Sequence, residues 1–245
     1  MIGDSFGPDW RREPRTGFHL RRYDLDGAAY DVAVAVPEGP EPAQGFPLLV
    51  VMDGAIHFDA VAAAAAALAR RPGKTEVGSS VVVGIASGAG WSHDPALRER
   101  DLLPDGAGCD ALHRLLGTRV LPDVAALAPV DPARRALFGH SFGGVFALDA
   151  LARDFSTCIA VSPSLWRAPD LAARVAAAIA GRDVRVLIAW GAREPQGDAD
   201  LPAAIDTLAA AGARVTHATI ADEDHGSVPF AVLPMALRFV HGVTR

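Results

Sequence analysis

The stretch 135–148 constrains the fold of this chain more than any other part. It begins with apolar residues that predict a buried strand, and residues 139–143 read Gly-His-Ser-Phe-Gly, followed by a predicted helix. Gly-x-Ser-x-Gly between a strand and a helix is typical of a nucleophile elbow, a strained turn that presents its serine above the edge of a sheet. We expect that a Cβ at Gly139 or Gly143 would collide with the neighbouring strand or helix. We therefore expect Ser141 to be a nucleophile.

Eight segments predict the strands of the sheet that carries this elbow. The first two are joined by Asp26-Gly27, a pair typical of a tight hairpin turn. The others alternate with predicted helices, and two of them are apolar throughout, as in strands that are covered on both faces. This order predicts an α/β fold with a mostly parallel central sheet of about eight strands and helices on both faces. The segments are 18–24, 30–36, 46–52, 80–85, 136–138, 157–161, 184–190 and 214–220.

Length and composition indicate how the chain is organised. With 245 residues, 50% of them hydrophobic and 21% charged, the chain fits a single α/β domain, 1–245, with a large core. We expect an irregular N-terminal segment at 1–16. We also expect a long loop over the active-site cleft at 87–108, since loops of that length within a domain are usually functional. The net charge of −6 argues against nucleic acid or an anionic membrane as a partner.

The N terminus and the cysteines bear on the compartment. The first ten residues contain neither the basic nor the apolar region of a secretion signal, and no apolar run is long enough to span a bilayer. Cys109 and Cys158 are expected to be free thiols. These features predict a cytoplasmic protein. No metal-ligand spacing and no phosphate-binding glycine motif occurs, so neither a metal nor a cofactor is expected. No pattern indicates the oligomeric state.

A serine nucleophile needs a base, and the base needs an acid that orients it. In proteins with this elbow the chain order is nucleophile, acid and histidine, so the base is expected after the last strand. His225 lies in that loop, whereas His217 lies within a predicted strand and His241 on a helix near the chain end. We predict that His225 is the base of Ser141.

The acid is expected in the loop after the preceding strand. Glu194 follows the segment 184–190 after a turn of three residues and is the first candidate. Its other role would be that of a solvated carboxylate or of a partner of Arg193. The remaining candidates lie further along the same loop or close to the histidine in sequence: Asp198, Asp200, Asp222 and Asp224.

The oxyanion that forms on a substrate carbonyl needs two preorganised N–H donors. One is the amide of Phe142, directly after the nucleophile. The other is expected after the third predicted strand, which ends in Asp53-Gly54-Ala55. We expect Gly54 to permit an unusual backbone there. Ala55 is therefore the first candidate for the second donor, and Gly54 is the neighbouring alternative.

Five short motifs between about residues 30 and 240 carry a family resemblance. They are Met52-Asp53-Gly54, Arg100-Asp101, Gly-His-Ser-Phe-Gly-Gly at 139–144, Ser162-Pro163-Ser164-Leu165-Trp166 and His225-Gly226. Together they resemble the "Putative esterase" family of α/β-hydrolases, most closely its ferric-siderophore (enterobactin-type) esterase branch. The Asp-Gly and Ser-Pro-Ser-x-Trp motifs are more specific than the elbow. The resemblance implies the α/β-hydrolase fold, the nucleophile, the base, an acid near Glu194 and an oxyanion donor after Gly54.

The resemblance further implies that Arg100, Asp101 and Trp166 line the substrate cleft, and we count His140, beside the nucleophile, with them. Arg100 could hold an anionic group such as a catecholate, or it could pair with Asp101 and tie down the long loop. Trp166 could wall the cleft or anchor a loop in the core, and we favour the cleft. After Trp166, where the siderophore branch tends to have a second aromatic residue, this chain has Arg167.

These features predict a serine esterase, a carboxylic ester hydrolase that works through an acyl-enzyme on a small-molecule substrate. By resemblance the substrate is a siderophore-like ester or lactone. An acyltransferase or cyclase with the same triad is one alternative, in which an alcohol or amine replaces water. A binding protein on a hydrolase fold without chemistry is the other alternative.

Overall fold

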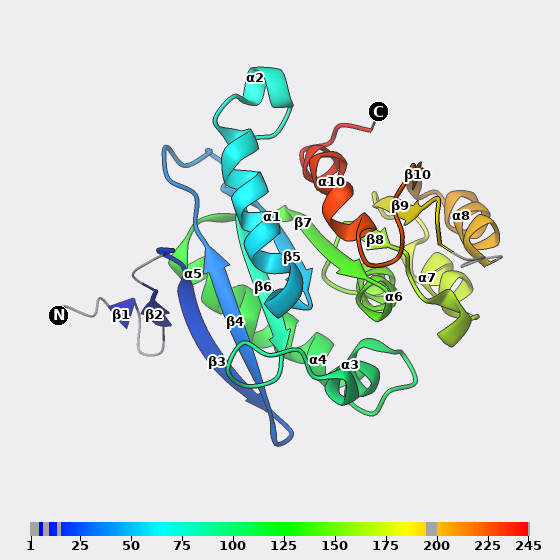
Figure 1. Cartoon of the computed structure of the whole chain (residues 1–245), viewed down its shortest axis with the longest axis horizontal. Helices are drawn as coiled ribbons and strands as arrows, with labels where there is room; N and C mark the ends of the chain where they lie inside the picture. Colours follow the sequence, from blue (N-terminus) through cyan, green and yellow to red (C-terminus); the bar gives the residue numbers. More distant parts are fainter. Residues whose placement is uncertain (1–4, 7–9, 14–15, 195–199, 245) are drawn as a thin grey trace.

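A computed structural model describes residues 5–6, 10–13, 16–194 and 200–244 of the chain (Figure 1). Ten strands of the described part form one sheet, in the order β1-β2-β3-β4-β6-β5-β7-β8-β9-β10. The strands are β1 (Ser5–Phe6), β2 (Trp10–Arg12), β3 (His19–Leu25), β4 (Ala28–Ala35), β5 (Phe46–Met52), β6 (Val81–Ser87), β7 (Val130–His140), β8 (Thr157–Val161), β9 (Arg185–Gly191) and β10 (Arg214–Ile220).

The helices connect these strands. They are α1 (Gly54–Ala69), α2 (Pro72–Thr75), α3 (Pro95–Leu102), α4 (Cys109–Leu115), the π-helix η1 (Leu116–Val120), α5 (Leu121–Leu127), α6 (Phe142–Asp149), the 3₁₀-helices η2 (Ala150–Ala152) and η3 (Leu165–Arg167), α7 (Leu171–Ile179), α8 (Asp200–Ala210), α9 (Val228–Ala231) and α10 (Leu233–Val240).

The sheet is parallel from β6 through β10 and antiparallel from β1 to β4 and between β4 and β6. The eight predicted strands correspond to β3–β10, so the prediction of a mostly parallel α/β sheet is confirmed. The N-terminal segment is not irregular throughout, because β1 and β2 extend the sheet beyond β3. Through β2, they supply hydrogen-bond partners for backbone groups of β3 that would lack partners if β3 were the edge strand. The sequence pattern did not reveal this pairing.

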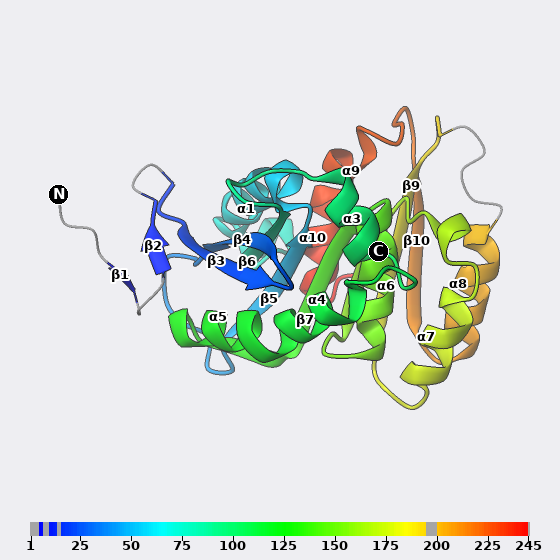
Figure 2. The same cartoon turned by 90° about the horizontal axis from the view of Figure 1, so that it is seen from below.

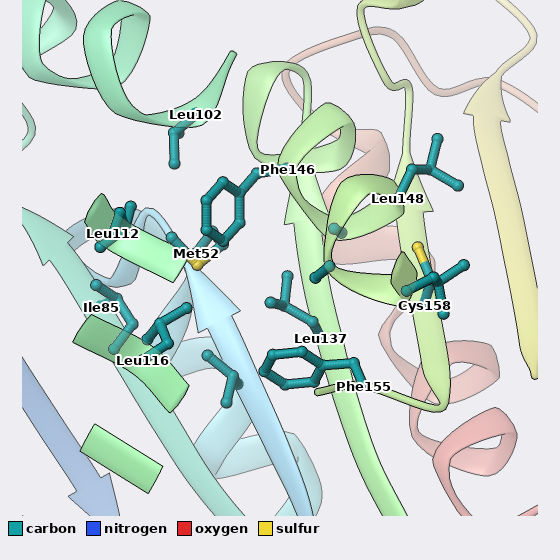
Figure 3. Packing of buried hydrophobic residues seen from close by; sticks show 14 of the residues in the cluster. Met52, Ile85, Leu102, Leu112, Leu116, Leu137, Phe146, Leu148, Phe155 and Cys158 are labelled. Atoms are coloured by element: carbon teal, nitrogen blue, oxygen red, sulfur yellow. The ribbon is translucent and has the colours of Figure 1, made fainter. Parts of the chain in front are cut away.

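Apolar side chains cover both faces of the sheet, which explains the continuous apolar runs. In β5, Leu48, Val50 and Met52 pack into one buried cluster, to which α4 to α8 contribute. Leu49 and Val51 alternate with them and pack into a second cluster with α1 and α10. Figure 2 shows these helices on the two sides of the sheet, and Figure 3 shows the first cluster from close by. Because β5 to β10 run parallel to their neighbours in this part of the sheet, their carboxyl ends lie along the same edge.

The segment 87–108, predicted as a long loop, contains the helix α3. The carboxylate of Asp94 accepts hydrogen bonds from the amides of Ala96 (2.9 Å) and Leu97 (3.2 Å), and Pro95 occupies the first helical position. Aspartate followed by proline is a favourable helix start, because it caps free amides and presets the backbone. This pair was the signal in the sequence. The prediction of an irregular segment is therefore wrong for 95–102.

The two cysteines are buried and free, as predicted. Burial raises the pKa of the Cys109 thiol to about 12, with a smaller contribution from nearby carboxylates. No helix in the described ranges has both the length and the apolar character that crossing a membrane requires.

Candidate active site

Ser141 occupies the turn between β7 and α6, where the sequence predicts the nucleophile. Its φ of 58° and ψ of −117° lie in a region that residues with side chains rarely adopt. The Ser141 amide donates to the carbonyl of Val161 (3.0 Å), and the Gly144 amide donates to the Ser141 carbonyl (3.0 Å). A Cβ on Gly139 would meet the backbone of Gly143, so glycine is required before the serine. The turn therefore has the strain of a nucleophile elbow.

Glu194 and His225, predicted as acid and base, lie side by side in the loops after β9 and β10. Glu194 Oε2 lies 2.9 Å from His225 Nδ1. Glu194 Oε1 accepts hydrogen bonds from the Ser162 hydroxyl (2.5 Å) and the Gly191 amide (2.6 Å). Burial alone would raise the pKa of Glu194, but these hydrogen bonds outweigh it and hold the pKa below its usual value. The carboxylate is therefore ionised near neutral pH and directs Nδ1 of His225 towards itself.

The competing histidines and carboxylates have other partners. His217 stacks on a tryptophan ring of β9, and His241 bonds a serine hydroxyl just before β6. Asp224 accepts hydrogen bonds from two amides of its own loop. Asp200 begins α8, and Asp198 lies outside the described residues. In the described part of the chain, Glu194 is thus the carboxylate that contacts His225.

The predicted oxyanion donors lie at the starts of two helices. Phe142 begins α6 and Gly54 begins α1, after the adjacent parallel strands β7 and β5. The first amides of a helix have no partner within it and can face an anion. The amides that follow Ala55 in α1 donate to the carbonyl of Asp53. Gly54 and Ala55 thus remain as candidates for the second donor, and the assignment stays a prediction.

The unusual backbone that was expected at Gly54 lies one residue earlier. Asp53 has a φ of 53° and a ψ of 47°, while Gly54 does not have a positive φ. Gly54 is required for a different reason, because a Cβ would lie 2.8 Å from the backbone nitrogen of Ile85 in β6. A Cβ on Gly143 would lie 3.2 Å from the Asp53 carboxylate, so this loop and the elbow are in close contact.

Asp101 does not line an open cleft, which corrects that prediction. It is fully buried, and Arg100 binds it through two contacts of 2.6 Å (Nε to Oδ1) and 3.0 Å (Nη2 to Oδ2). The Tyr30 hydroxyl also bonds this carboxylate. The loop-anchoring alternative is therefore the one observed, and it ties the end of α3 to β4. A direct substrate contact of Arg100, whose side chain is one-third exposed, stays a prediction.

His140 lies between two other histidines. Its ring centroid is 4.5 Å from that of His225 and 5.7 Å from that of His57. Burial, together with the charges of these neighbours, lowers the pKa of His140 to about 3, so its ring is neutral. Its Nε2 is buried without a hydrogen-bond partner among the described residues. The structure thus packs His140 against the predicted base, and its contact with substrate stays a prediction.

Trp166 is 64% exposed next to the elbow loop. The Arg167 guanidinium lies 5.6 Å from the Trp166 ring and 5.4 Å from the Phe142 ring. Arg167 also pairs with Glu99 of α3 (2.9 Å) and borders a hollow of about 280 Å³. The guanidinium of Arg167 thus lies beside two rings, at the position where the siderophore esterase branch tends to have a second aromatic residue. The role of Trp166 as a cleft wall stays a prediction.

One family model covers most of the chain. The model of the family described as "Putative esterase" matches residues 27–230. The chain belongs to this esterase family. It is an ester hydrolase, as the sequence predicted.

Individual proteins match between 62% and 96% of the chain. Ferri-bacillibactin esterase BesA of Bacillus subtilis is 26% identical over 259 residues, which cover 92% of this chain and 89% of BesA. The apo-salmochelin esterase of Escherichia coli O6:H1 is 32% identical over 171 residues, 62% of this chain and 53% of that protein. The crystal structure of the BES protein from Bacillus cereus has a TM-score of 0.80 at 20% identity, covering 96% of this chain and 99% of that chain. The α/β-hydrolase fold is thus confirmed.

Arg98 of α3 is a site residue of this esterase that the sequence did not predict. Its guanidinium binds the Asp53 carboxylate through Nε (2.6 Å) and Nη2 (3.0 Å), and it lies 5.5 Å from the Phe142 ring. The Asp53 side chain is only 1% exposed, so the ion pair is largely removed from water. A carboxylate at the end of a buried strand needs such a partner, but the sequence does not say which arginine supplies it.

Ser162 and Ser164 also contact the site, although only their motif was recognised. The Ser162 hydroxyl donates to Glu194, as described above. Ser164 Oγ lies 3.1 Å from Ser141 Oγ. Both serines are buried in the loop after β8. The Ser-Pro-Ser motif was the signal, and only the folded chain reveals the two partners.

One possible metal-ligand group occurs in the described part of the chain, at the far end of α6 from the nucleophile. Cys109, His113 and Asp149 offer ligand atoms that lie within 4.8 Å of one another. Asp149 also pairs with Arg174 (3.0 Å) and Arg153 (3.6 Å). These guanidinium groups already balance its charge and disfavour a divalent cation. We therefore assign no metal to this group.

Proposed function

We propose that the protein hydrolyses a siderophore-like ester or lactone, with Ser141 as nucleophile, His225 as base and Glu194 as acid. The observation that carries this proposal is the 2.9 Å contact between Glu194 and His225, in loops beside the nucleophile elbow. An ionised carboxylate on Nδ1 leaves Nε2 of the ring to accept a proton, which is the tautomer that serine activation requires.

In the first half of the reaction, His225 removes the proton of the Ser141 hydroxyl while Oγ attacks the ester carbonyl. The carbonyl oxygen becomes negative, and the amides of Phe142 and of Ala55 or Gly54 donate to it. Glu194 stabilises the imidazolium without taking its proton. His225 then protonates the departing alcohol, and the acyl group remains on the serine.

In the second half, His225 deprotonates a water that attacks the acyl carbonyl. The same amides hold the oxyanion, and Ser141 Oγ leaves with the proton from His225. The free acid is released and the serine is restored. An alcohol or amine that replaced water at this step would give the transferase alternative, which an analysis of the products distinguishes.

Two observations support the substrate class. Two of the relatives described above are named for ferri-bacillibactin and apo-salmochelin. We therefore take a siderophore ester as the substrate class of this protein too. The guanidinium of Arg167 lies near both the exposed Trp166 ring and the ring of Phe142, the residue after the nucleophile. Rings and guanidinium groups together suit a planar, anionic group such as a catecholate. We further propose that the reaction takes place in the cytoplasm.

The test is incubation with an enterobactin-type cyclic triester and mass analysis of the products, with and without added alcohols. We expect opened, free-acid products, and we expect a fluorophosphonate to label Ser141 stoichiometrically. Ser141→Ala should lose activity by several orders of magnitude and keep its fold. A well-folded Ser141→Ala variant with wild-type turnover would disprove the proposal. Products joined to the added alcohol would favour the transferase alternative.

A further inference from the structure

Two hydroxyls of the loop 162–164 contact opposite ends of the proposed triad. We propose that this loop is a two-point clamp: Ser164 is a catalytic residue that donates a hydrogen bond to Ser141 Oγ, and Ser162 is a positioning residue that holds Glu194. The inference rests on the proposed function and adds two residues to its machinery.

The contact of Ser164 is with the reacting atom itself. Ser164 Oγ lies 3.1 Å from Ser141 Oγ, and the Ser164 amide donates to the Ser141 carbonyl (3.2 Å). Ser164 is 7% exposed, so little water competes for its hydroxyl. Ser164 thus contacts Ser141 through both its amide and its hydroxyl, and these two contacts fix the position of Ser141 Oγ.

The chemistry determines which serine donates. The Ser141 hydroxyl must donate its hydrogen to His225, so it cannot donate the same hydrogen to Ser164. The proton between the two oxygens is therefore that of Ser164. Negative charge grows on Ser141 Oγ as His225 removes its proton, and again when Oγ departs from the acyl group. A donor that is already in place stabilises both states without reorganisation.

Ser162 holds the other end of the triad. Its hydroxyl donates to Glu194 Oε1 at 2.5 Å, and its own amide donates to the carbonyl of Ala189 in β9 (2.7 Å). Glu194 Oε2 is thereby left for His225. Ser162 is 1% exposed and has a φ of 42°, a strained value for a residue with a side chain. Strain at a buried serine that bonds the acid is consistent with a functional constraint.

Pro163 joins the clamp to the elbow. A Cβ on Gly144 would lie 3.0 Å from both Cα and Cβ of Pro163, so the proline fills the space that this glycine leaves open. The ring also restricts the backbone between the two serines. The loop can therefore hold both hydroxyls at fixed positions. The close contact with Pro163 explains why Gly143 is followed directly by another glycine, Gly144. The restricted backbone explains why a proline lies between the two serines.

The experiment compares Ser164→Ala, Ser164→Thr and Ser162→Ala with the wild type in the full chain. The matched control is Ser80→Ala, because Ser80 is equally buried, at 7% exposed, and its Oγ bonds a side chain, His241 Nε2, at 3.0 Å. The readouts are kcat and KM for p-nitrophenyl acetate, the rate of fluorophosphonate labelling, the pH profile of kcat/KM, and the circular dichroism spectrum.

We expect Ser164→Ala to lower kcat and the labelling rate by about tenfold or more, with KM within about twofold and the pH profile unmoved. Ser164→Thr keeps the hydroxyl and should recover most of this loss. Ser162→Ala should lower kcat and also move the midpoint of the kcat/KM profile to higher pH, because a less compensated Glu194 charge favours the imidazolium of His225. Ser80→Ala should stay within about twofold of the wild type.

Two results would overturn the inference, and they are distinguishable. If the wild type is labelled at Ser141 and Ser164→Ala reacts at the wild-type rate, the clamp is wrong and the proposed function stands. If the wild type is not labelled and Ser141→Ala keeps its turnover, the proposed function fails and the clamp fails with it.

Discussion

Replacing Glu194 with glutamine tests the triad more sharply than removing its side chain. The Ser162 hydroxyl and the Gly191 amide both donate to the same carboxylate oxygen, Oε1. In Glu194→Gln these two donors select the amide oxygen for that position, so the NH2 group must face Nδ1 of His225. Nδ1 then has to accept a hydrogen bond, and the ring proton moves to Nε2. That tautomer cannot accept the proton of Ser141.

The size of the effect follows from this tautomer. The shape of the side chain is kept, two of its hydrogen bonds are unchanged and the third is reversed in direction, so we expect little change in the free energy of unfolding at neutral pH, within about 1 kcal/mol. Activity should fall much further. An equivalent acid-to-amide change in a Ser-His-Asp triad lowers kcat by about 10⁴-fold, and we expect a loss of the same order.

The assay is p-nitrophenyl acetate turnover of the wild type, Glu194→Gln and Glu194→Ala, with intact-mass analysis after a fluorophosphonate. We expect slow labelling of Ser141 in both variants and turnover near background in Glu194→Gln. Urea denaturation checks that both variants are folded. Turnover of folded Glu194→Gln within tenfold of the wild type, with labelling still at Ser141, would refute the reasoning and move the acid elsewhere.

Three further predictions concern stability. Arg98→Met leaves the buried Asp53 carboxylate without its guanidinium partner, with the His93 ring 3.7 Å away as the remaining neighbour. It should lower the free energy of unfolding by about 3–5 kcal/mol in urea titrations, and a loss below about 1 kcal/mol would contradict the buried ion pair. Gly139→Ala should give no folded protein by circular dichroism, because its Cβ meets backbone, and a native spectrum would exclude the elbow geometry. Burial lowers the folded-state pKa of His57 to about 4 and that of His140 to about 3. The unfolded chain thus binds more protons, and stability should fall below about pH 6.5 by up to about 1.4 kcal/mol per pH unit for each ring. Urea titrations at pH 7 and pH 5 measure this slope, and equal stability at both would refute it.

The centre of the sheet was largely predictable, because the strands there are covered on both faces. Runs such as 46–52 and 80–85 have no polar alternation, and this composition fits little except a buried parallel strand. The short strands β1 and β2 and the helix α3 were missed for a common reason. They are short segments with polar residues, and their own sequences differ little from those of loops. Pairing with the edge of the sheet stabilises β1 and β2, and the Asp94-Pro95 start stabilises α3.

The chain order of an elbow protein was sufficient to select Glu194 and His225 from several carboxylates and histidines. The contacts around them were not predictable. Arg98 reaches Asp53 across 45 residues, and Ser162 reaches Glu194 across 32 residues. Such pairs depend on which strand ends become neighbours in the sheet. Asp101 misled the prediction because a motif residue that anchors a loop and one that binds substrate look alike in sequence.

Three residues with strained backbones that lie directly after parallel strands have a consequence for efforts to make the protein heat-resistant. Asp53, Ser141 and Ser162 have φ values of 53°, 58° and 42° at the ends of the parallel strands β5, β7 and β8. Such conformations cost on the order of 1–3 kcal/mol each, and glycine is the residue that relieves them. Directed evolution that screens only for survival of heating should therefore accumulate glycines here, and each one would delete a side chain of the site. A screen that also requires turnover would have to find its gains elsewhere, among the exposed helices and loops.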